Sequence, residues 1–327
     1  MKLLNHLNMK TTVFIILMIV SMVTASAQPE RLMSSSRESI DAASIRYKTM
    51  MIGGLSIFYR EAGDPSKPTI LMLHGFPSSS HMYRDLLRDL ASTYHVIAPD
   101  YPGFGLSSCP GVDQYEYTFD NLSTTVEQFI IALKLTEVVL YVQDYGGPIG
   151  FRIASRRPKL IRALIIQNAN AYKEGLGDAI APMKNYFTNP TEETEKGARW
   201  IFTTTKWQYT DGAGDSSRIS PDSYLVDQFF LDRPGIDKIQ LALFRDYKNN
   251  LTLYPKWQSY FREMQPPALV LWGRNDKIFI APGAEAYKRD LKKIEVHLLN
   301  GGHFMLEEYH QEAAKLIHSF LVKNLLQ

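Results

Sequence analysis

VVLYVQDYGGPIG, residues 138–150 of this 327-residue chain, is the stretch that decides the fold. Its first five residues are apolar and rich in valine, which is typical of a buried central strand. The apolar run is followed by Gln-Asp-Tyr and then by two glycines, and a helical pattern begins near Pro148. A strand that turns sharply into a helix presents one side chain above the sheet at the turn. Here that side chain is Asp144, so the rest of the chain must show whether a carboxylate at this point carries chemistry.

Strand and helix patterns alternate on both sides of this stretch. Short apolar strand patterns occupy residues 69–73, 95–98, 161–166, 266–271 and 294–299, and residues 51–61 are typical of a hairpin. Helix patterns lie between or after them, at residues 80–90, 119–133, 148–157, 281–291 and 306–325. The alternation predicts an α/β fold whose parallel sheet is covered by helices on both faces. Functional side chains are then expected in the loops at the carboxyl ends of the strands.

The strand signal disappears between residues 170 and 261. This segment is rich in Tyr, Trp, Phe, Lys and Thr and has few β-branched apolar runs. We interpret it as a mostly helical insertion. The expected organisation is therefore a core formed by residues 28–170 and 263–327, with a helical cap at residues 171–262.

The first 27 residues have the features of a secretory signal peptide. Lys2 and Lys10 precede the apolar run 13–20, and the small residues Ala25-Ser26-Ala27 form a cleavage site. We expect a secreted protein, most consistent with a bacterial periplasm, with no stable membrane insertion after cleavage. An uncleaved membrane anchor is the alternative, but the apolar run is short for a bilayer span.

Charge and cysteine content exclude several classes of partner and scaffold. The formal net charge is +2, and loss of Lys2 and Lys10 with the signal would bring it to zero. No basic run is left that would favour nucleic acid. Cys109 is the single cysteine, so an internal disulfide is impossible. The composition does not distinguish a monomer from a homodimer.

Three polar residues each follow a predicted strand in a glycine-containing turn. They are Asp144, Asp276 in WGRND, and His303 in NGGH. The order nucleophile, acid, histidine is that of the α/β-hydrolase triad, with aspartate in the position of the serine. The chain contains no G-x-S-x-G sequence, so no serine competes for this role.

Four stretches together make the chain resemble the α/β-hydrolase fold, and within it the epoxide hydrolase and haloalkane dehalogenase branch. His74-Gly75-Phe76-Pro77 is similar to the HGxP motif, and residues 103–107 (GFGLS) are similar to the G-x-small-x-Ser motif of epoxide hydrolases. Residues 143–147 (QDYGG) resemble the nucleophile turn, and Asp276 with His303 completes the triad. The resemblance implies a mostly parallel eight-stranded sheet with a helical cap.

One residue departs from this pattern. Val142 stands two positions before Asp144, where such turns often have glycine. Because the strand and the following helix cross closely there, a larger residue implies a slightly opened turn.

An aspartate nucleophile implies different chemistry from a serine. A carboxylate is already charged, and its natural target is an sp³ carbon with a strained or good leaving group, which gives an alkyl-enzyme ester. His303, oriented by Asp276, would then activate water against the ester carbonyl. The resemblance places the oxyanion-binding N–H groups at Phe76 and Tyr145.

The cap is expected to supply the partner of the leaving group. Residues 247–249 (Tyr-Lys-Asn) are similar to the Tyr-Arg-Asn sequence that carries a cap tyrosine in epoxide hydrolases, and Tyr186 is the candidate for a second tyrosine. Haloalkane dehalogenases usually place Trp directly after the nucleophile. Tyr145 at that position counts against a halide site, although Trp200 and Trp207 are available to line one.

These observations predict a cofactor-free hydrolase, with no metal site, that acts on a small apolar organic substrate. Epoxide opening is the expected reaction, and dehalogenation by the same aspartate is the alternative. A third hypothesis, from another class, is a non-catalytic binder of small molecules that kept the fold.

Overall fold

Eight strands form one sheet in the computed structural model, which describes residues 44–325. The strands are β1 (Arg46–Ile52), β2 (Leu55–Ala62), β3 (Thr69–Leu73), β4 (His95–Pro99), β5 (Val138–Gln143), β6 (Ile161–Gln167), β7 (Ala268–Gly273) and β8 (Ile294–Leu299). Their spatial order is β1-β2-β4-β3-β5-β6-β7-β8. The pairs β1–β2 and β2–β4 are antiparallel and the other pairs are parallel, so the predicted α/β fold with a mostly parallel eight-stranded sheet is confirmed.

The helices follow the strands in the alternation expected from the sequence. They are α2 (Arg84–Leu90), α3 (Phe119–Ala132), α4 (Gly146–Arg156), α5 (Ala181–Thr188), α6 (Glu192–Arg199), α7 (Thr205–Thr210), α8 (Pro221–Leu231), α9 (Ile236–Met264), α10 (Pro282–Ala286) and α11 (Leu306–Leu325). The segment expected as one helix at residues 281–291 is shorter, because α10 gives way to a 3₁₀ turn at Tyr287–Arg289.

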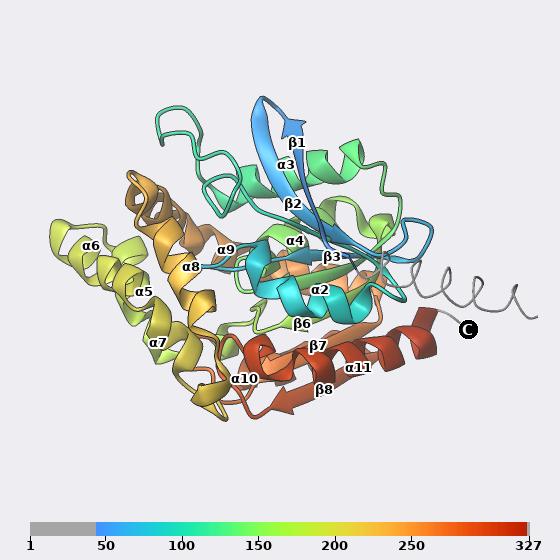
Figure 1. The fold of residues 1–327 in the computed structure, drawn as a ribbon. Helices are drawn as coiled ribbons and strands as arrows, with labels where there is room; N and C mark the ends of the chain where they lie inside the picture. Colours follow the sequence, from blue (N-terminus) through green and yellow to red (C-terminus); the bar gives the residue numbers. More distant parts are fainter. Residues whose placement is uncertain (1–43, 326–327) are drawn as a thin grey trace, which may run out of the picture.

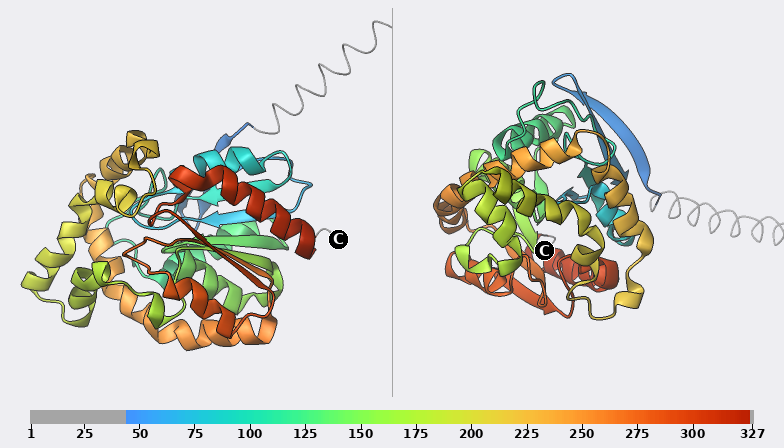
Figure 2. Two further views of the ribbon diagram at one scale, coloured as in Figure 1. Left: turned by 90° about the horizontal axis from the view of Figure 1, so that it is seen from below. Right: turned by 90° about the vertical axis from the view of Figure 1, so that its left-hand side faces the viewer.

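Both faces of the sheet are buried, because alternate residues of each strand point to opposite faces. Leu71 and Leu73 of β3 join an apolar cluster with residues of α3, α4 and α9. Ile70 and Met72 join a second cluster with residues of α2 and α11 on the other face. Figure 2 shows α11 crossing one face of the sheet while α9 runs along the other. The central strand β5 is consequently buried at all six positions.

Helices α5 to α8 lie together at one end of the sheet, as Figure 1 shows. They correspond to the larger part of the expected cap segment 171–262. The long helix α9 joins this group to the core. Near its N-terminal half, Phe187 of α5 stacks on Tyr247 with 6.1 Å between ring centroids, whereas Trp257 packs against Phe151 of α4 at 5.6 Å. By its contacts the C-terminal half of α9 is thus part of the core, although it falls within the range expected for the cap.

The predicted signal peptide, residues 1–27, lies outside the described residues, as does the start of the polar segment after it. Within residues 44–325, no helix is long and apolar enough to cross a membrane.

Candidate active site

Asp144 lies at the turn between β5 and α4, in a left-handed backbone conformation with φ of 47°. Aspartate tolerates this conformation better than most residues. The turn is held from a neighbouring strand, because the Asp144 N–H donates a 3.2 Å hydrogen bond to the carbonyl of Asn168. A side chain at Gly146 would place its Cβ 2.0 Å from the carbonyl oxygen of Leu73 in β3. Glycine at 146 is therefore required for α4 to start this close to the sheet, and the turn projects the Asp144 carboxyl beyond the strand ends.

The loop after β3 approaches the same carboxyl. The Phe76 N–H donates a 2.7 Å hydrogen bond to Oδ1 of Asp144. Gly75 permits this approach, because a Cβ at this position would lie 2.3 Å from the Cβ of Asp144. The backbone N–H of Tyr145 also lowers the pKa of the Asp144 carboxyl, which indicates that it lies near that group. The two N–H groups that the family resemblance singled out thus both face Asp144.

His303 and Asp276 form a hydrogen-bonded pair beside Asp144. Nδ1 of His303 lies 2.8 Å from Oδ2 of Asp276, and Nε2 lies 3.9 Å from Oδ2 of Asp144. Asp276 also accepts hydrogen bonds of 2.7 Å from the side chain of Asn168 and from the Ile278 N–H. A carboxylate is an acceptor only, so it holds the proton of neutral His303 on Nδ1 and leaves the lone pair of Nε2 free to accept a hydrogen bond.

Burial and charge shift the titration of both groups. Burial raises the pKa of Asp144 to about 6, against the opposing effects of His303 and of the two backbone donors, with a further small increase from the charge of Asp276. For His303, burial favours the neutral form, but the attraction and hydrogen bond of Asp276, together with Asp144, raise its pKa above the usual value. Such shifts are typical of groups that exchange protons or attack electrophiles at neutral pH.

A narrow pocket lies between the Asp144 carboxyl and the cap helices. About 20 Å³ of it is open to water, which is room for about one water molecule. Its walls are mostly apolar and aromatic, with a few polar groups. The lining residues are Phe76, Asp144, Tyr145, Ile180, Met183, Ile201, Gln208, Phe244, Tyr247, Ile278, Phe279 and His303.

Of the two cap tyrosines expected at the pocket, the structure places only Tyr247 there. Burial raises the pKa of its hydroxyl well above the usual value, so the group keeps its proton and can donate it in a hydrogen bond. Tyr186 does not line the pocket, and its hydroxyl lies 3.5 Å from Oε2 of Glu195 in α6. Helix α5 contributes Met183 to the lining of this pocket in place of Tyr186.

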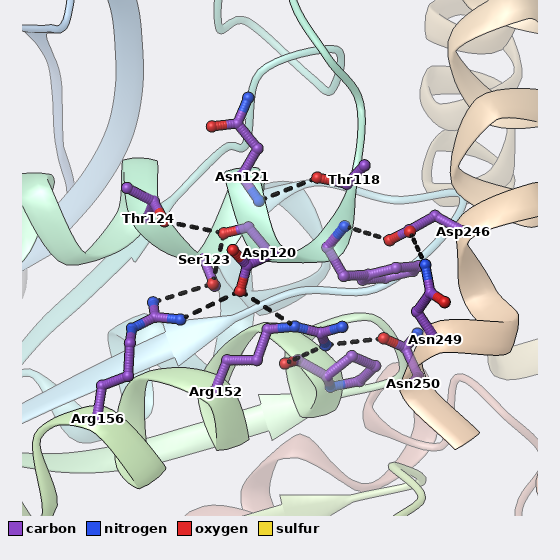
Figure 3. A network of polar contacts seen from close by, with 12 residues as sticks. Thr118, Asp120, Asn121, Ser123, Thr124, Arg152, Arg156, Asp246, Asn249 and Asn250 are labelled. Atoms are coloured by element: carbon purple, nitrogen blue, oxygen red, sulfur yellow. Dashed lines mark hydrogen bonds and ion pairs between the residues drawn. The ribbon is translucent and has the colours of Figure 1, made fainter. Parts of the chain in front are cut away.

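Polar contacts on either side of Tyr247 tie helix α9 to the core (Figure 3). The preceding residue, Asp246, accepts a 2.7 Å hydrogen bond from the N–H of Phe119 at the start of α3. Three residues after Tyr247, Asn250 accepts a 2.7 Å hydrogen bond from the buried Arg152 of α4. Because α4 begins at Gly146, two residues after Asp144, these contacts connect the helix that carries Tyr247 to the element that follows the carboxyl.

Comparison with known proteins identifies the fold family of the chain. Residues 68–309 match the family described as the alpha/beta hydrolase fold. This chain belongs to the α/β-hydrolase family.

The chain is 39% identical over 289 residues to an uncharacterized hydrolase, YNR064C, of Saccharomyces cerevisiae, with 85% of this chain and 97% of the relative covered. It is 26% identical to epoxide hydrolase 3 of Mus musculus, with 82% and 74% covered. Among solved structures, the haloalkane dehalogenase DatA from Agrobacterium tumefaciens C58 superposes with a TM-score of 0.73 at 23% identity, covering 86% of this chain and 97% of that one. At this identity the last similarity shows the fold alone.

Three residues of this α/β-hydrolase site carried no role in the sequence analysis. Asn168 connects the two predicted carboxylates, because its carbonyl accepts from the Asp144 N–H and its amide donates to Asp276. Gln143 lies 3.1 Å from His303, between their Nε2 atoms. Gln208 of α7 lines the pocket, and its Oε1 is buried without a hydrogen-bond partner. Asn168 directly follows β6, and Gln143 is the last residue of β5. Their positions at the carboxyl ends of strands are the signal that could have identified them. No comparable feature of the local sequence marks Gln208.

Within residues 44–325, no three side chains of His, Cys, Asp or Glu gather in the way that metal ligands do.

Proposed function

We propose that this α/β-hydrolase opens epoxides through a covalent ester on Asp144. The observation that carries the proposal is that the two carboxylate oxygens of Asp144 have different surroundings. Oδ1 is held by the Phe76 N–H at 2.7 Å, whereas Oδ2 faces His303 at 3.9 Å, beyond hydrogen-bond distance, and is not fixed by a direct hydrogen bond to that ring. A carboxylate that is oriented by one oxygen and open at the other is suited to attack an sp³ carbon.

In the first step, Oδ2 of Asp144 attacks one carbon of the epoxide. The C–O bond on that carbon breaks, and its electron pair goes to the epoxide oxygen. Tyr247 lines the same pocket, and in this proposal its hydroxyl donates a hydrogen bond and then a proton to that oxygen. The product is a β-hydroxy ester of Asp144, and the tyrosine recovers its proton from solvent after the step.

In the second step, Nε2 of His303 takes a proton from water, and the resulting hydroxide attacks Cγ of the ester. Asp276, at 2.8 Å from Nδ1, stabilises the imidazolium that forms. The negative charge develops on the carbonyl oxygen, where the N–H groups of Phe76 and Tyr145 stabilise it. Collapse of this intermediate takes the proton back from His303, breaks the ester bond and releases a diol.

Dehalogenation by the same carboxylate is the second candidate. One observation favours it: Tyr145 lines the pocket and its hydroxyl is buried without a hydrogen-bond partner, so this group is available to donate to a halide. Phe76 and Tyr145 supply no indole N–H or side-chain amide for a halide, whereas Tyr247 supplies a protonated hydroxyl that can donate to an epoxide oxygen. Epoxide opening is therefore the reaction that we place first.

Mass spectrometry of a His303→Ala variant distinguishes these reactions. Without its base the variant should form the ester but not hydrolyse it. An epoxide would add its whole mass to the protein, whereas a haloalkane would add its mass less one hydrogen halide. The double variant Asp144→Asn/His303→Ala is the control and should carry no adduct. Saturable binding without any adduct would support a non-catalytic binder and would contradict the proposal.

A further inference from the structure

Gln143 contacts the predicted base directly. It is the last residue of β5, it is fully buried, and its Nε2 lies 3.1 Å from Nε2 of His303. Its carboxamide lies against the loop after β3, since a Cβ at Gly75 would meet Oε1 of Gln143 at 2.3 Å. Gln143 Oε1 is buried and has no hydrogen-bond partner. The amide therefore makes its hydrogen bond only on the side of His303.

The direction of the Gln143–His303 hydrogen bond follows from the other partner of the ring. Asp276 accepts the proton on Nδ1, so Nε2 of the neutral ring has a lone pair and must accept. The amide NH₂ of Gln143 is then the donor. A protonated ring would carry a hydrogen on Nε2 that points at this NH₂ group, which is unfavourable. In its present orientation the amide thus favours neutral His303.

If the Gln143 carboxamide rotates by half a turn, it favours the protonated form of His303 over the neutral form. Oε1 would then take the place of Nε2 and accept from the protonated ring, and no existing hydrogen bond of Oε1 would be lost. The charged groups that face His303 are Asp276, beyond β7, and Asp144, at the end of β5. The rings of Phe279 and Phe304 cover its remaining sides. Gln143 is thus the one uncharged polar side chain with a recorded hydrogen bond to His303 among the described residues.

We propose that Gln143 is a positioning residue with two states. Its amide nitrogen holds His303 neutral and away from the Asp144 carboxylate in the free enzyme, and its amide oxygen accepts from His303 while the ring carries the proton taken from water. Without this amide, the nearest polar partner for Nε2 is Oδ2 of Asp144 at 3.9 Å, and a direct ion pair would occupy both the base and the nucleophile. The role in turnover rests on the proposed ester mechanism, whereas the protonation of His303 can be measured without substrate.

The first test is an NMR titration of the His303 ring in the wild type and in two variants. Gln143→Leu removes the donor, and Gln143→Glu replaces it with an acceptor. Gln143→Glu should raise the pKa of His303 by about 1 or more, because a carboxylate accepts from the protonated ring and cannot donate to the neutral one. Gln143→Leu removes the donor of one state and the acceptor of the other, so its change in pKa should be smaller than that of glutamate. Gln167→Leu is the matched control, because Gln167 is the register partner of Gln143 on β6 and is equally buried. It should leave the titration of His303 unchanged.

The second test separates the two chemical steps by rapid-quench kinetics. In Gln143→Glu the acid limb of the hydrolysis rate should move to higher pH by the same amount as the NMR value, giving a roughly tenfold loss of rate on that limb. An unchanged pKa of His303 in both Gln143 variants would overturn the proposal even if ester chemistry is confirmed. A raised pKa in an enzyme that forms no ester would keep the Gln143–His303 coupling and remove the proposed function alone.

Discussion

A Cβ atom added to Gly150 would lie 2.6 Å from Cγ1 of Val142. The strand β5 and the helix α4 therefore cross closely in spite of the valine, because the glycine lies on the helix instead of the strand. From the sequence we expected Val142 to open the turn slightly. The structure shows instead that the space for its side chain comes from the partner element, eight residues later.

Substitution of Gly150 by alanine should destabilise the protein by about 1–3 kcal/mol, because the added methyl group overpacks the contact with Val142. Val142→Ala alone should also cost stability, since it leaves a small cavity. The double variant should recover part of the loss, with a coupling of about 1 kcal/mol in a cycle measured by urea unfolding. Strictly additive effects would show that the two positions do not share this space.

Asn in place of Asp144 should abolish turnover and stabilise the fold at neutral pH. The loss of the nucleophile should reduce turnover by at least about 10³-fold. The pKa of Asp144 in the folded protein, about 6, lies above the ordinary value of 3.8. The protonated form is thus the one that burial favours, so this group's contribution is complete below about pH 4 and is lost as the pH rises through about 6.

At pH 8 the Asp144→Asn variant should therefore unfold at higher urea concentration than the wild type, by an amount on the order of 1–3 kcal/mol. At pH 4 the two proteins should differ little. For turnover of the wild type, the ester-forming step should slow as the pH falls below about 6, because the carboxylate is lost. An inactive variant that is also less stable at pH 8 would contradict this prediction.

The two cap tyrosines form a matched pair for mutagenesis. Tyr247→Phe should slow ester formation from an epoxide by about 10²–10⁴-fold, since the hydroxyl that protonates the leaving oxygen is removed. Tyr186→Phe is the control, because this buried tyrosine reaches Glu195 and not the pocket, and its effect should be small. Single-turnover kinetics measure both. A small effect of Tyr247→Phe would shift the preference to a halide substrate.

The sequence was most informative where chemistry coincides with the end of a strand. Asp144, Asp276 and His303 each follow an apolar run and stand in a glycine-containing turn, so their convergence could be predicted from the parallel sheet. Helices in the cap carry no such marker. The face of α5 that meets the pocket depends on how the helix is rotated, which is why Met183 and not Tyr186 lines it. Gln208 reaches the site only through the packing of α7.

A buried carboxyl links the cap to the loop after β3, away from the catalytic chemistry. Asp227 of α8 is fully buried, and it accepts a 2.5 Å hydrogen bond from the Tyr209 hydroxyl and a 3.3 Å one from the hydroxyl of Ser78. The ring of Tyr209 stacks on Phe304, the neighbour of His303, with 3.9 Å between centroids. Burial raises the pKa of Asp227 to about 7, since the hydroxyl donors and the more distant Arg84 only partly offset it and the charge of Glu307 adds to the increase.

The free energy of unfolding should consequently fall as the pH rises and Asp227 ionises. The contribution of this carboxyl is complete below about pH 4 and disappears as the pH passes the folded-state value of about 7, because the fold then holds an uncompensated charge. Asp227→Asn keeps an acceptor for Tyr209 and removes the charge. Relative to the wild type it should gain on the order of 2–4 kcal/mol between pH 4 and pH 8. Urea unfolding of both proteins at these two pH values measures the gain. If the variant and the wild type differ in stability by the same amount at both pH values, Asp227 is ionised throughout. Its two hydroxyl donors would then be sufficient to stabilise the charge.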